Sequence, residues 1–311
     1  MEKPYYDLNT YFKNIFGHRV HKISIDAGMS CPNRDGRLST SGCIYCNQKG
    51  SGTGRFHKGF SVTDQLENAK VYVRKRFKAQ KFIAYFQSFT NTYAPIDHLK
   101  RLYDEALAVE DVIGLAIGTR PDCVDEDILN LLQGYAKNFL IWIEYGLQSA
   151  HDETLSLINR GHNFKAFKDA VEATQKRGIH ICVHVILGLP GETRTQMLET
   201  AKILSRMEIN GLKFHLLYVI KGTEMEKWHH EGTYTCLTMQ EYADLVCEFL
   251  SYVPKTVVVQ RLTSDPHPGE LIAPSWALHK ESIRSLIRQT FGVRDLYQGK
   301  WFQPVSEKPK L

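Results

Sequence analysis

Apolar, β-branched runs recur along the chain, and each of them ends near a glycine, a proline or a polar turn. Six lie in residues 21–28, 81–87, 112–119, 139–148, 180–188 and 211–219, and a further candidate lies in 256–263. Most are apolar on both faces, which is typical of parallel strands covered by helices on each side. Stretches with helical spacing fill the gaps between them. This alternation predicts an α/β fold, a partial (β/α)6 TIM-like barrel of parallel strands with a C-terminal extension.

The predicted helices carry their apolar residues on one face. The first follows Ser61, and its apolar residues are Val62, Leu66, Ala69, Val73 and Phe77. Residues 128–135, 193–207 and 238–253 have the same pattern. We see no internal repeat and no linker. We therefore expect a lead-in over 1–20, a core barrel over 21–255 and an extension over 256–311 that packs on the barrel.

The composition excludes a membrane or disordered protein. Hydrophobic residues make up 43% of the 311, and no apolar run reaches the length of a membrane span. The first residues lack the apolar segment of a signal peptide, so we expect a cytoplasmic protein without a membrane partner. The net charge of +5 fits an RNA substrate but is common among enzymes. In the cytoplasm, clustered cysteines indicate metal binding or catalysis instead of disulfides.

Three of the seven cysteines lie in the loop after the first predicted strand, spaced as Cys31-x11-Cys43-x2-Cys46. In barrels of this kind the loops at the carboxyl ends of the strands carry function. Three thiolates can hold an iron–sulfur cluster with one iron left open. A zinc site with His57 as fourth ligand and a chance group of reduced cysteines are the alternatives. The other four cysteines are scattered, and we expect buried small residues there.

Seven motifs, in order and each near a strand end, make the chain resemble the radical S-adenosylmethionine (SAM) superfamily. The resemblance is specifically to the YhcC-type proteins, which have the same core as the catalytic subunit of elongator. It covers about residues 15–300, and the motifs are CPNRDG, SGCIYC, AYFQSFTNTYAP, TRPDC, IEYGLQSAHDETLSLINRGH, HVILGLPGET and KFHLLYVIKGT. The common superfamily pattern has three residues between its first two cysteines. The eleven found here resemble the expanded spacing of the elongator-like branch.

The resemblance implies a [4Fe–4S] cluster on Cys31, Cys43 and Cys46, with SAM bound beside it. The SAM contacts implied at matching positions are Tyr45 for the adenine, Glu144 and Gln148 for the ribose and methionyl parts, Arg160 for the carboxylate, and Ile186 beside the adenine. At the end of the second strand the chain departs from the family pattern, and Gln87 and Ser88 stand where the family's glycine pair and acidic residue contact SAM. An ordinary packed tyrosine and a surface arginine are the alternatives for Tyr45 and Arg160. A carboxylate such as Glu144 in so apolar a strand also needs a buried partner.

The implied activity is reductive cleavage of SAM to a 5′-deoxyadenosyl radical. The elongator likeness suggests tRNA as substrate, at the C5 side chain of the wobble uridine, with an electron donor such as flavodoxin or ferredoxin. A small-molecule or porphyrin-type substrate is the alternative within this class. From another class, the alternative is a zinc-stabilised RNA-binding protein without catalysis.

Overall fold

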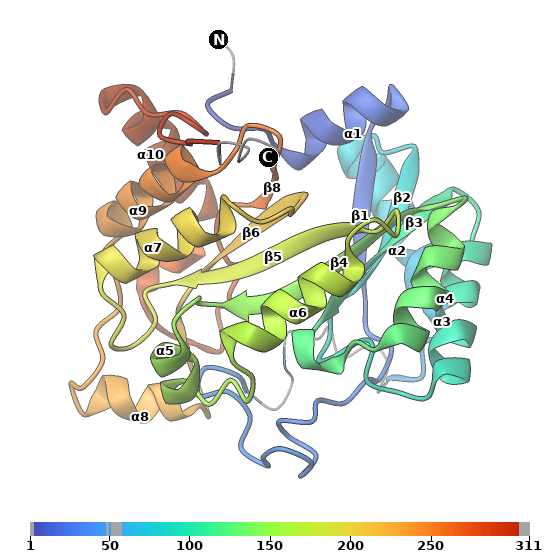
Figure 1. The fold of residues 1–311 in the computed structure, drawn as a ribbon, viewed down its shortest axis with the longest axis horizontal. Coiled ribbons are helices and arrows are strands. Elements are labelled where there is room, and N and C mark those ends of the chain that lie inside the picture. The colour runs from blue at the N-terminus through green and yellow to red at the C-terminus, as the bar shows by residue number, and fades with distance from the viewer. Residues whose placement is uncertain (1–2, 48–49, 51–57, 305–311) are drawn as a thin grey trace, which may run out of the picture.

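Seven parallel strands form one sheet, curled into a half-barrel (Figure 1). The computed structural model describes residues 3–47, 50 and 58–304. In spatial order the strands are β1 (Val20–Ile25), β2 (Lys81–Phe86), β3 (Val112–Thr119), β4 (Leu140–Gln148), β5 (His180–Leu187), β6 (Gly211–Leu216) and β8 (Val258–Arg261). The predicted α/β partial barrel is confirmed. The candidate run at 256–263 supplies the seventh strand, which pairs with β6.

Helices cover the outer face of the sheet. They are α2 (Val62–Phe77), α3 (Ile96–Ala108), α4 (Glu126–Ala136), α6 (Phe164–Thr174), α7 (Arg194–Leu204), α9 (Met239–Tyr252) and α10 (Lys280–Val293), the last of which packs on α9. Side chains from both layers form the largest core cluster. Capping boxes begin three of these helices: Ser61 with Asp64 in α2, Thr193 with Gln196 in α7, and Thr238 with Glu241 in α9. None of the described helices is long and apolar enough to cross a membrane.

Close packing of β3 against β4 depends on a glycine. A Cβ atom built on Gly114 would lie 2.0 Å from the carbonyl oxygen of Leu140 in the neighbouring strand. No side chain can adjust to a contact with backbone at this distance. The glycine in the run VIGLAIGT is therefore a requirement of strand approach.

The inner face of the half-barrel is closed at one end and open at the other. Helix α1 (Leu8–Phe16) covers the amino ends of the strands, where Tyr11 and Phe12 pack with Trp142 of β4. In Figure 1 the blue loop that follows β1 runs at the opposite end, near α5 (Asp152–Leu157) and α8 (Glu224–His230). That open end is the edge at which barrels of this kind bind their ligands.

The C-terminal region contributes one wall of this open end. A two-stranded antiparallel sheet joins β7 (Val219–Ile220) to β9 (Leu271–Ala273). The segment between β8 and β9 borders the open end. The boundary predicted at residues 255–256 precedes β8 and so cuts one strand from the sheet. The division into lead-in, core and extension stays a prediction.

Candidate functional site

A cavity of about 570 Å³ opens at the carboxyl ends of the strands. All predicted site residues except Ser88 line it: Cys31, Tyr45, Cys43, Cys46, Gln87, Glu144, Gln148, Arg160 and Ile186. They come from the loop after β1, from the end of β2, from β4 and β5, and from the turn that follows α5. Cys31 and Arg160, which are 129 positions apart in the chain, therefore line the same cavity.

The loop that carries the cysteines is anchored to the turn after α5. The backbone amide of Ile44 donates to the carbonyl of Ile158 at 3.1 Å, and Asn33 Nδ2 donates to the carbonyl of Asn159 at 2.6 Å. Asn33 also reaches Gly161, where a Cβ atom would lie 3.0 Å from its Oδ1. Within the loop, the Cys46 amide donates to the Cys43 carbonyl at 2.9 Å. These bonds hold the C-x2-C pair against the turn that follows α5.

Two N–H donors face the sulfur of Cys43. Asn33 Nδ2 lies 3.7 Å from this sulfur and Arg160 Nη1 lies 3.8 Å from it. Burial and the nearby Cys43 thiol raise the pKa of Cys46 to about 11, against the effect of the Arg34 guanidinium. Thiolates are the protein ligands of iron–sulfur clusters, and three cysteine thiols line one cavity here. The donor set therefore fits a metal centre.

Among the described residues, the three cysteine sulfurs do not all lie within 4.8 Å of one another. Four ligands at the Zn–S distance of about 2.3 Å would place their sulfurs about 3.8 Å apart, so the three thiols are not closed around a single zinc ion. His57, the fourth ligand of the zinc alternative, lies outside the described residues.

Arg160 is a buried residue with 7% of its surface exposed, so it is not a surface arginine. Its Nη2 and Nε donate to the carbonyl of Gly146 at 2.6 and 3.2 Å, which leaves Nη1 toward Cys43. The carbonyl of Arg160 itself accepts from Arg120, whose guanidinium is paired with Asp122 at 2.8 Å. This arrangement holds one cationic fork beside the cysteine loop.

Gly146 makes room for that fork. A Cβ atom on Gly146 would lie 2.7 Å from Arg160 Nη2 and 2.8 Å from Gln148 Nε2. Gln148 ends β4 with a φ of 81° and lines the cavity. The structure thus brings Gln148 and Arg160 together over one glycine.

The other residues predicted to contact SAM differ in where they lie relative to the cavity. Tyr45 packs with Ile186 in one apolar cluster at the open end, so the packed-tyrosine alternative stays open. Gln87 lines the cavity at the end of β2, near Ser24, whose Oγ lies 3.5 Å from its Oε1. Ser88 is buried outside the lining, and its Oγ has no hydrogen-bond partner among the residues that the structure describes. The SAM contacts assigned to these residues stay predictions.

Glu144 has the buried partners that its position in an apolar strand requires. Its side chain is fully buried and forms ion pairs with Lys22 of β1 and Lys213 of β6. His184 Nε2 of β5 also donates to it at 2.8 Å. Burial opposes ionisation of this carboxyl, but the two ammonium groups hold its pKa well below the usual range. Its predicted contact with SAM therefore competes with three bonds that the carboxylate already accepts.

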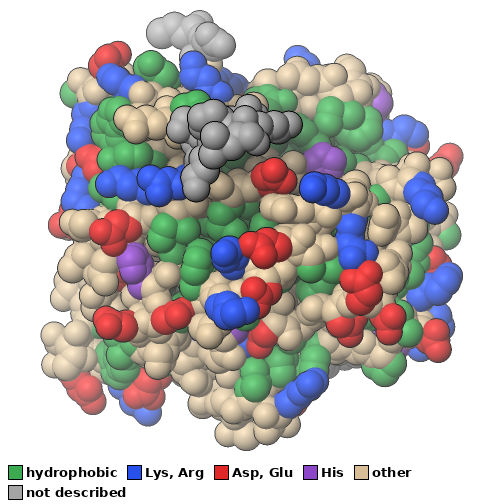
Figure 2. Space-filling model, viewed as in Figure 1, with side chains coloured by type: hydrophobic (Ala, Val, Ile, Leu, Met, Phe, Trp, Pro, Cys, Tyr) green, Lys and Arg blue, Asp and Glu red, His purple; other side chains and the backbone are tan. Residues whose placement is uncertain are grey.

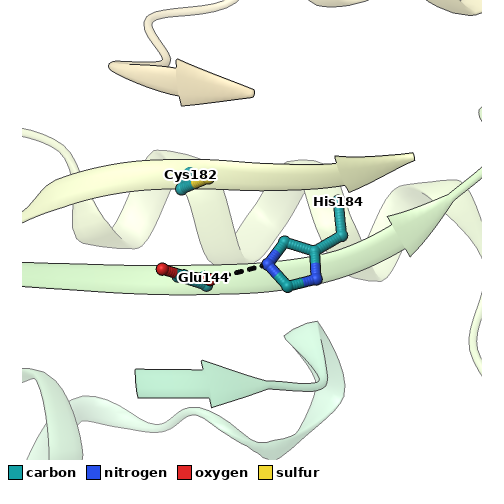
Figure 3. Close-up of side chains that lie close together, drawn as sticks. All are labelled: Glu144, Cys182 and His184. Carbon is teal, nitrogen blue, oxygen red and sulfur yellow. Dashed lines mark hydrogen bonds and ion pairs between the residues drawn. The ribbon is translucent and has the colours of Figure 1, made fainter. Parts of the chain in front are cut away.

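Glu144 also lies close to Cys182 and His184, and the three offer ligand atoms within 4.8 Å of one another (Figure 3). In Figure 3 a dashed line joins only Glu144 and His184. Two lysine ammonium groups already neutralise the carboxylate, and burial raises the pKa of the Cys182 thiol to about 12. A protonated thiol beside a lysine-paired carboxylate is a poor metal site. The trio belongs to a network of charges inside the barrel.

Sequence reasoning missed Lys22, Lys213 and Arg261 of this network. The signal was available, because a lysine inside a strand that is apolar on both faces needs a buried partner as much as a glutamate does. Lys22 lies in HKISIDAG and Lys213 in GLKFHLLYV, each at such a position. Which partner each lysine meets depends on the order of the strands in the sheet.

Comparisons with known proteins agree with the family resemblance described from the sequence motifs. A family model described as "Radical SAM superfamily" matches residues 35–204, and one described as "Radical_SAM C-terminal domain" matches 209–291. YtqA of Bacillus subtilis is 38% identical over 310 residues, which is 100% of this chain and 96% of that protein. YhcC of Escherichia coli is 35% identical over 84% of this chain and 84% of that protein.

The chain also resembles more distant proteins, some of which are named for an activity on tRNA. A tRNA uridine(34) acetyltransferase of Dehalococcoides mccartyi is 28% identical over 58% of this chain and 39% of that protein. The solved structure of archaeal Methanocaldococcus infernus Elp3 matches with a TM-score of 0.67 at 17% identity. It covers 90% of this chain and 64% of that chain, and at this identity the likeness is one of fold.

Proposed function

The chain belongs to the radical SAM superfamily, and we propose that it uses this chemistry to modify tRNA at the C5 side chain of the wobble uridine. As a member of the superfamily it is an enzyme that uses SAM and a [4Fe–4S] cluster. The observation that carries the SAM-dependent chemistry is the shared cavity. Three thiols of one loop, the fork of Arg160 and the ends of β4 and β5 all line it.

The residues present fit both cofactors. Cys31, Cys43 and Cys46 would hold the cluster, and Arg160 would pair with the carboxylate of SAM. When bound, the cluster supplies the electron that cleaves SAM and yields a 5′-deoxyadenosyl radical. N–H donors from Asn33 and Arg160 at the Cys43 sulfur stabilise negative charge there, which is one way a protein tunes a cluster.

The remaining cofactor contacts are part of the proposal. Tyr45 and Ile186 would cover the adenine, since they pack together at the open end. Gln148 would orient the ribose or methionyl part, and Gln87 with Ser88 would contribute at the end of β2. Their shared role is to position SAM and exclude water from the cavity.

Support for tRNA comes from the relatives and, weakly, from charge. Two relatives that match only part of this chain are named tRNA uridine(34) acetyltransferase. The chain has a net charge of +5. On the face drawn in Figure 2, basic and acidic side chains are interspersed, so this face offers no continuous basic surface for a polyanion. An electron donor such as flavodoxin or ferredoxin would reduce the cluster.

Anaerobic reconstitution tests the enzyme. We expect about four irons per chain and release of 5′-deoxyadenosine when SAM and a reductant are added. Cys43→Ala should lose the iron while the barrel stays folded, and Cys236→Ala, which changes a cysteine outside the cavity lining, should keep it. A colourless protein with one zinc and no reaction with SAM would refute the proposal, as would normal iron in Cys43→Ala.

The substrate is tested separately. Modified nucleosides in tRNA from cells with and without the gene should differ at the wobble uridine. An unchanged profile would remove tRNA as substrate and leave a small-molecule or porphyrin-type substrate as the alternative.

A further inference from the structure

A directed chain of hydrogen bonds runs from Glu144 across the inner face to Arg261 at the end of β8. His184 Nε2 lies 2.8 Å from Glu144 Oε2, and His215 Nε2 lies 3.2 Å from His184 Nδ1. Arg261 Nη2 lies 2.5 Å from His215 Nδ1. The four side chains therefore connect β4, β5, β6 and β8, and all of them line the cavity.

Bonding partners determine the direction of this chain. An ionised carboxylate only accepts, so His184 Nε2 must carry a proton. Burial, with the charge of Lys213, lowers the pKa of His184 to about 3, so the ring is neutral and its Nδ1 accepts from His215 Nε2. His215 Nδ1 is then free to accept from Arg261. Each side chain is oriented by a hydrogen bond to its neighbour, and together these bonds position the guanidinium of Arg261.

Arg261 has donors to spare. Its Nε lies 3.4 Å from the carbonyl of Phe214, and its Nη2 donates to His215 Nδ1. Within residues 3–47, 50 and 58–304, no hydrogen bond occupies its Nη1 and no carboxylate pairs with it. A guanidinium has five N–H groups, so most of them remain for a ligand in the cavity.

The charges around the network leave an excess of positive charge. Lys22, Lys213 and Arg261 face the single carboxylate of Glu144. Two other carboxylates line the cavity. Asp265 is paired with Lys280, and Glu270, which accepts from Asn47 at 3.2 Å, still leaves the three cations in excess over Glu144 and Glu270. Arg261 is half-buried in this lining and no carboxylate pairs with it among the described residues, so the cavity is complementary to an added negative charge.

SAM cannot supply that charge as well as bind Arg160. SAM carries one carboxylate, and Arg160 beside Cys43 is the residue proposed to pair with it. Arg261 lies on β8, which is separated from β4 by β5 and β6 in the sheet. Two arginines on different walls of one cavity call for two anions.

We propose that Arg261, positioned by the chain through His215 and His184, binds an anionic oxygen group of the substrate, either a carboxylate or a phosphate. This inference rests on the proposed function, because it assigns the second anion to the substrate of the SAM-dependent reaction. It names Arg261 as a residue that determines which substrates enter the cavity.

The test is an anion titration of the full-length, cluster-reconstituted protein, in which thermal unfolding is measured at each anion concentration. The probes are sodium acetate and sodium dimethyl phosphate, with sodium chloride at matched ionic strength as reference. At an anion concentration of about ten times its Kd, we expect wild type to gain about 3 °C in Tm. Arg261→Met should weaken the apparent Kd at least tenfold, and Arg261→Lys should weaken it less.

Arg206→Met is the matched control, since Arg206 is exposed at the end of α7 and lies outside the cavity lining. It should bind the anions as wild type does. Circular dichroism checks that each variant is folded. If Arg261→Met does not fold, anion binding by Arg261→Lys is compared with that of wild type. Equal anion stabilisation of wild type and the Arg261 variants, or none in wild type, would overturn the inference.

The two probes distinguish the two sources of the anion. Tighter binding of acetate indicates a carboxylate on the substrate, and tighter binding of dimethyl phosphate indicates a phosphodiester. The titration needs neither reductant nor turnover. A failure of SAM cleavage therefore counts against the proposed function alone, and a failure of anion binding counts against Arg261 alone.

Discussion

Replacing Glu144 by glutamine tests whether the buried charge network stabilises the fold. The substitution keeps the shape of the side chain but removes the one carboxylate shared by Lys22, Lys213 and His184. Leaving buried ammonium groups without their anion costs about 3–5 kcal/mol in other proteins. With Glu144 fully buried and Lys22 and Lys213 nearly so, we expect a loss in this range at pH 7.

Urea unfolding followed by circular dichroism under anaerobic conditions measures this loss. Glu126→Gln is the matched control, because Glu126 is 66% exposed and forms a surface ion pair with Arg177. We expect that variant to lose no more than about 1 kcal/mol. Similar losses in the two variants would refute the reasoning.

The pH dependence gives a second check with a defined sign. Burial already lowers the pKa of Lys22, and removal of Glu144 lowers it further. A lysine whose folded pKa is below its unfolded value destabilises the fold at neutral pH, and this penalty disappears as the pH approaches about 10.4. The difference between wild type and Glu144→Gln should therefore shrink from pH 7 to pH 10. A difference that grows with pH would contradict the network.

Two further predictions concern single residues. Gly146→Ala would place a methyl group 2.7 Å from Arg160 Nη2, so we expect Arg160 to shift and the Kd for SAM to rise about tenfold or more. Gly134→Ala in α4, where a Cβ meets nothing within 4 Å, is the control and should bind SAM with the Kd of wild type. Equal Kd values for Gly146→Ala and Gly134→Ala would contradict the role given to Gly146. Burial raises the pKa of Glu192 to about 7. Since this folded pKa is above the unfolded value, the stabilisation is present below about pH 4.3 and is lost as pH rises through 7. Glu192→Gln should remove this loss, up to about 3 kcal/mol, and an unchanged pH profile of urea unfolding would contradict it.

Local pattern was enough to predict much of the fold. Runs that are apolar on both faces, such as residues 112–119 and 180–188, form the strands β3 and β5. They can be recognised because burial on both faces leaves a mark in consecutive residues. The helix α2 was equally clear from its apolar face and its Ser61 cap. The pairing of β8 with β6 was not, since four residues give too short a pattern.

The sequence by itself predicted a metal centre in the cysteine loop, because its donors lie within sixteen consecutive positions. Only the tertiary structure decided what surrounds it. Arg160 faces Cys43 from 117 positions away, and Lys22 meets Glu144 from 122 positions away. Contacts of this kind follow from strand order and from which face each side chain takes, and no local periodicity records them. For that reason a metal site in the cysteine loop could be proposed from the sequence, while the position of Arg261 in the cavity lining could not.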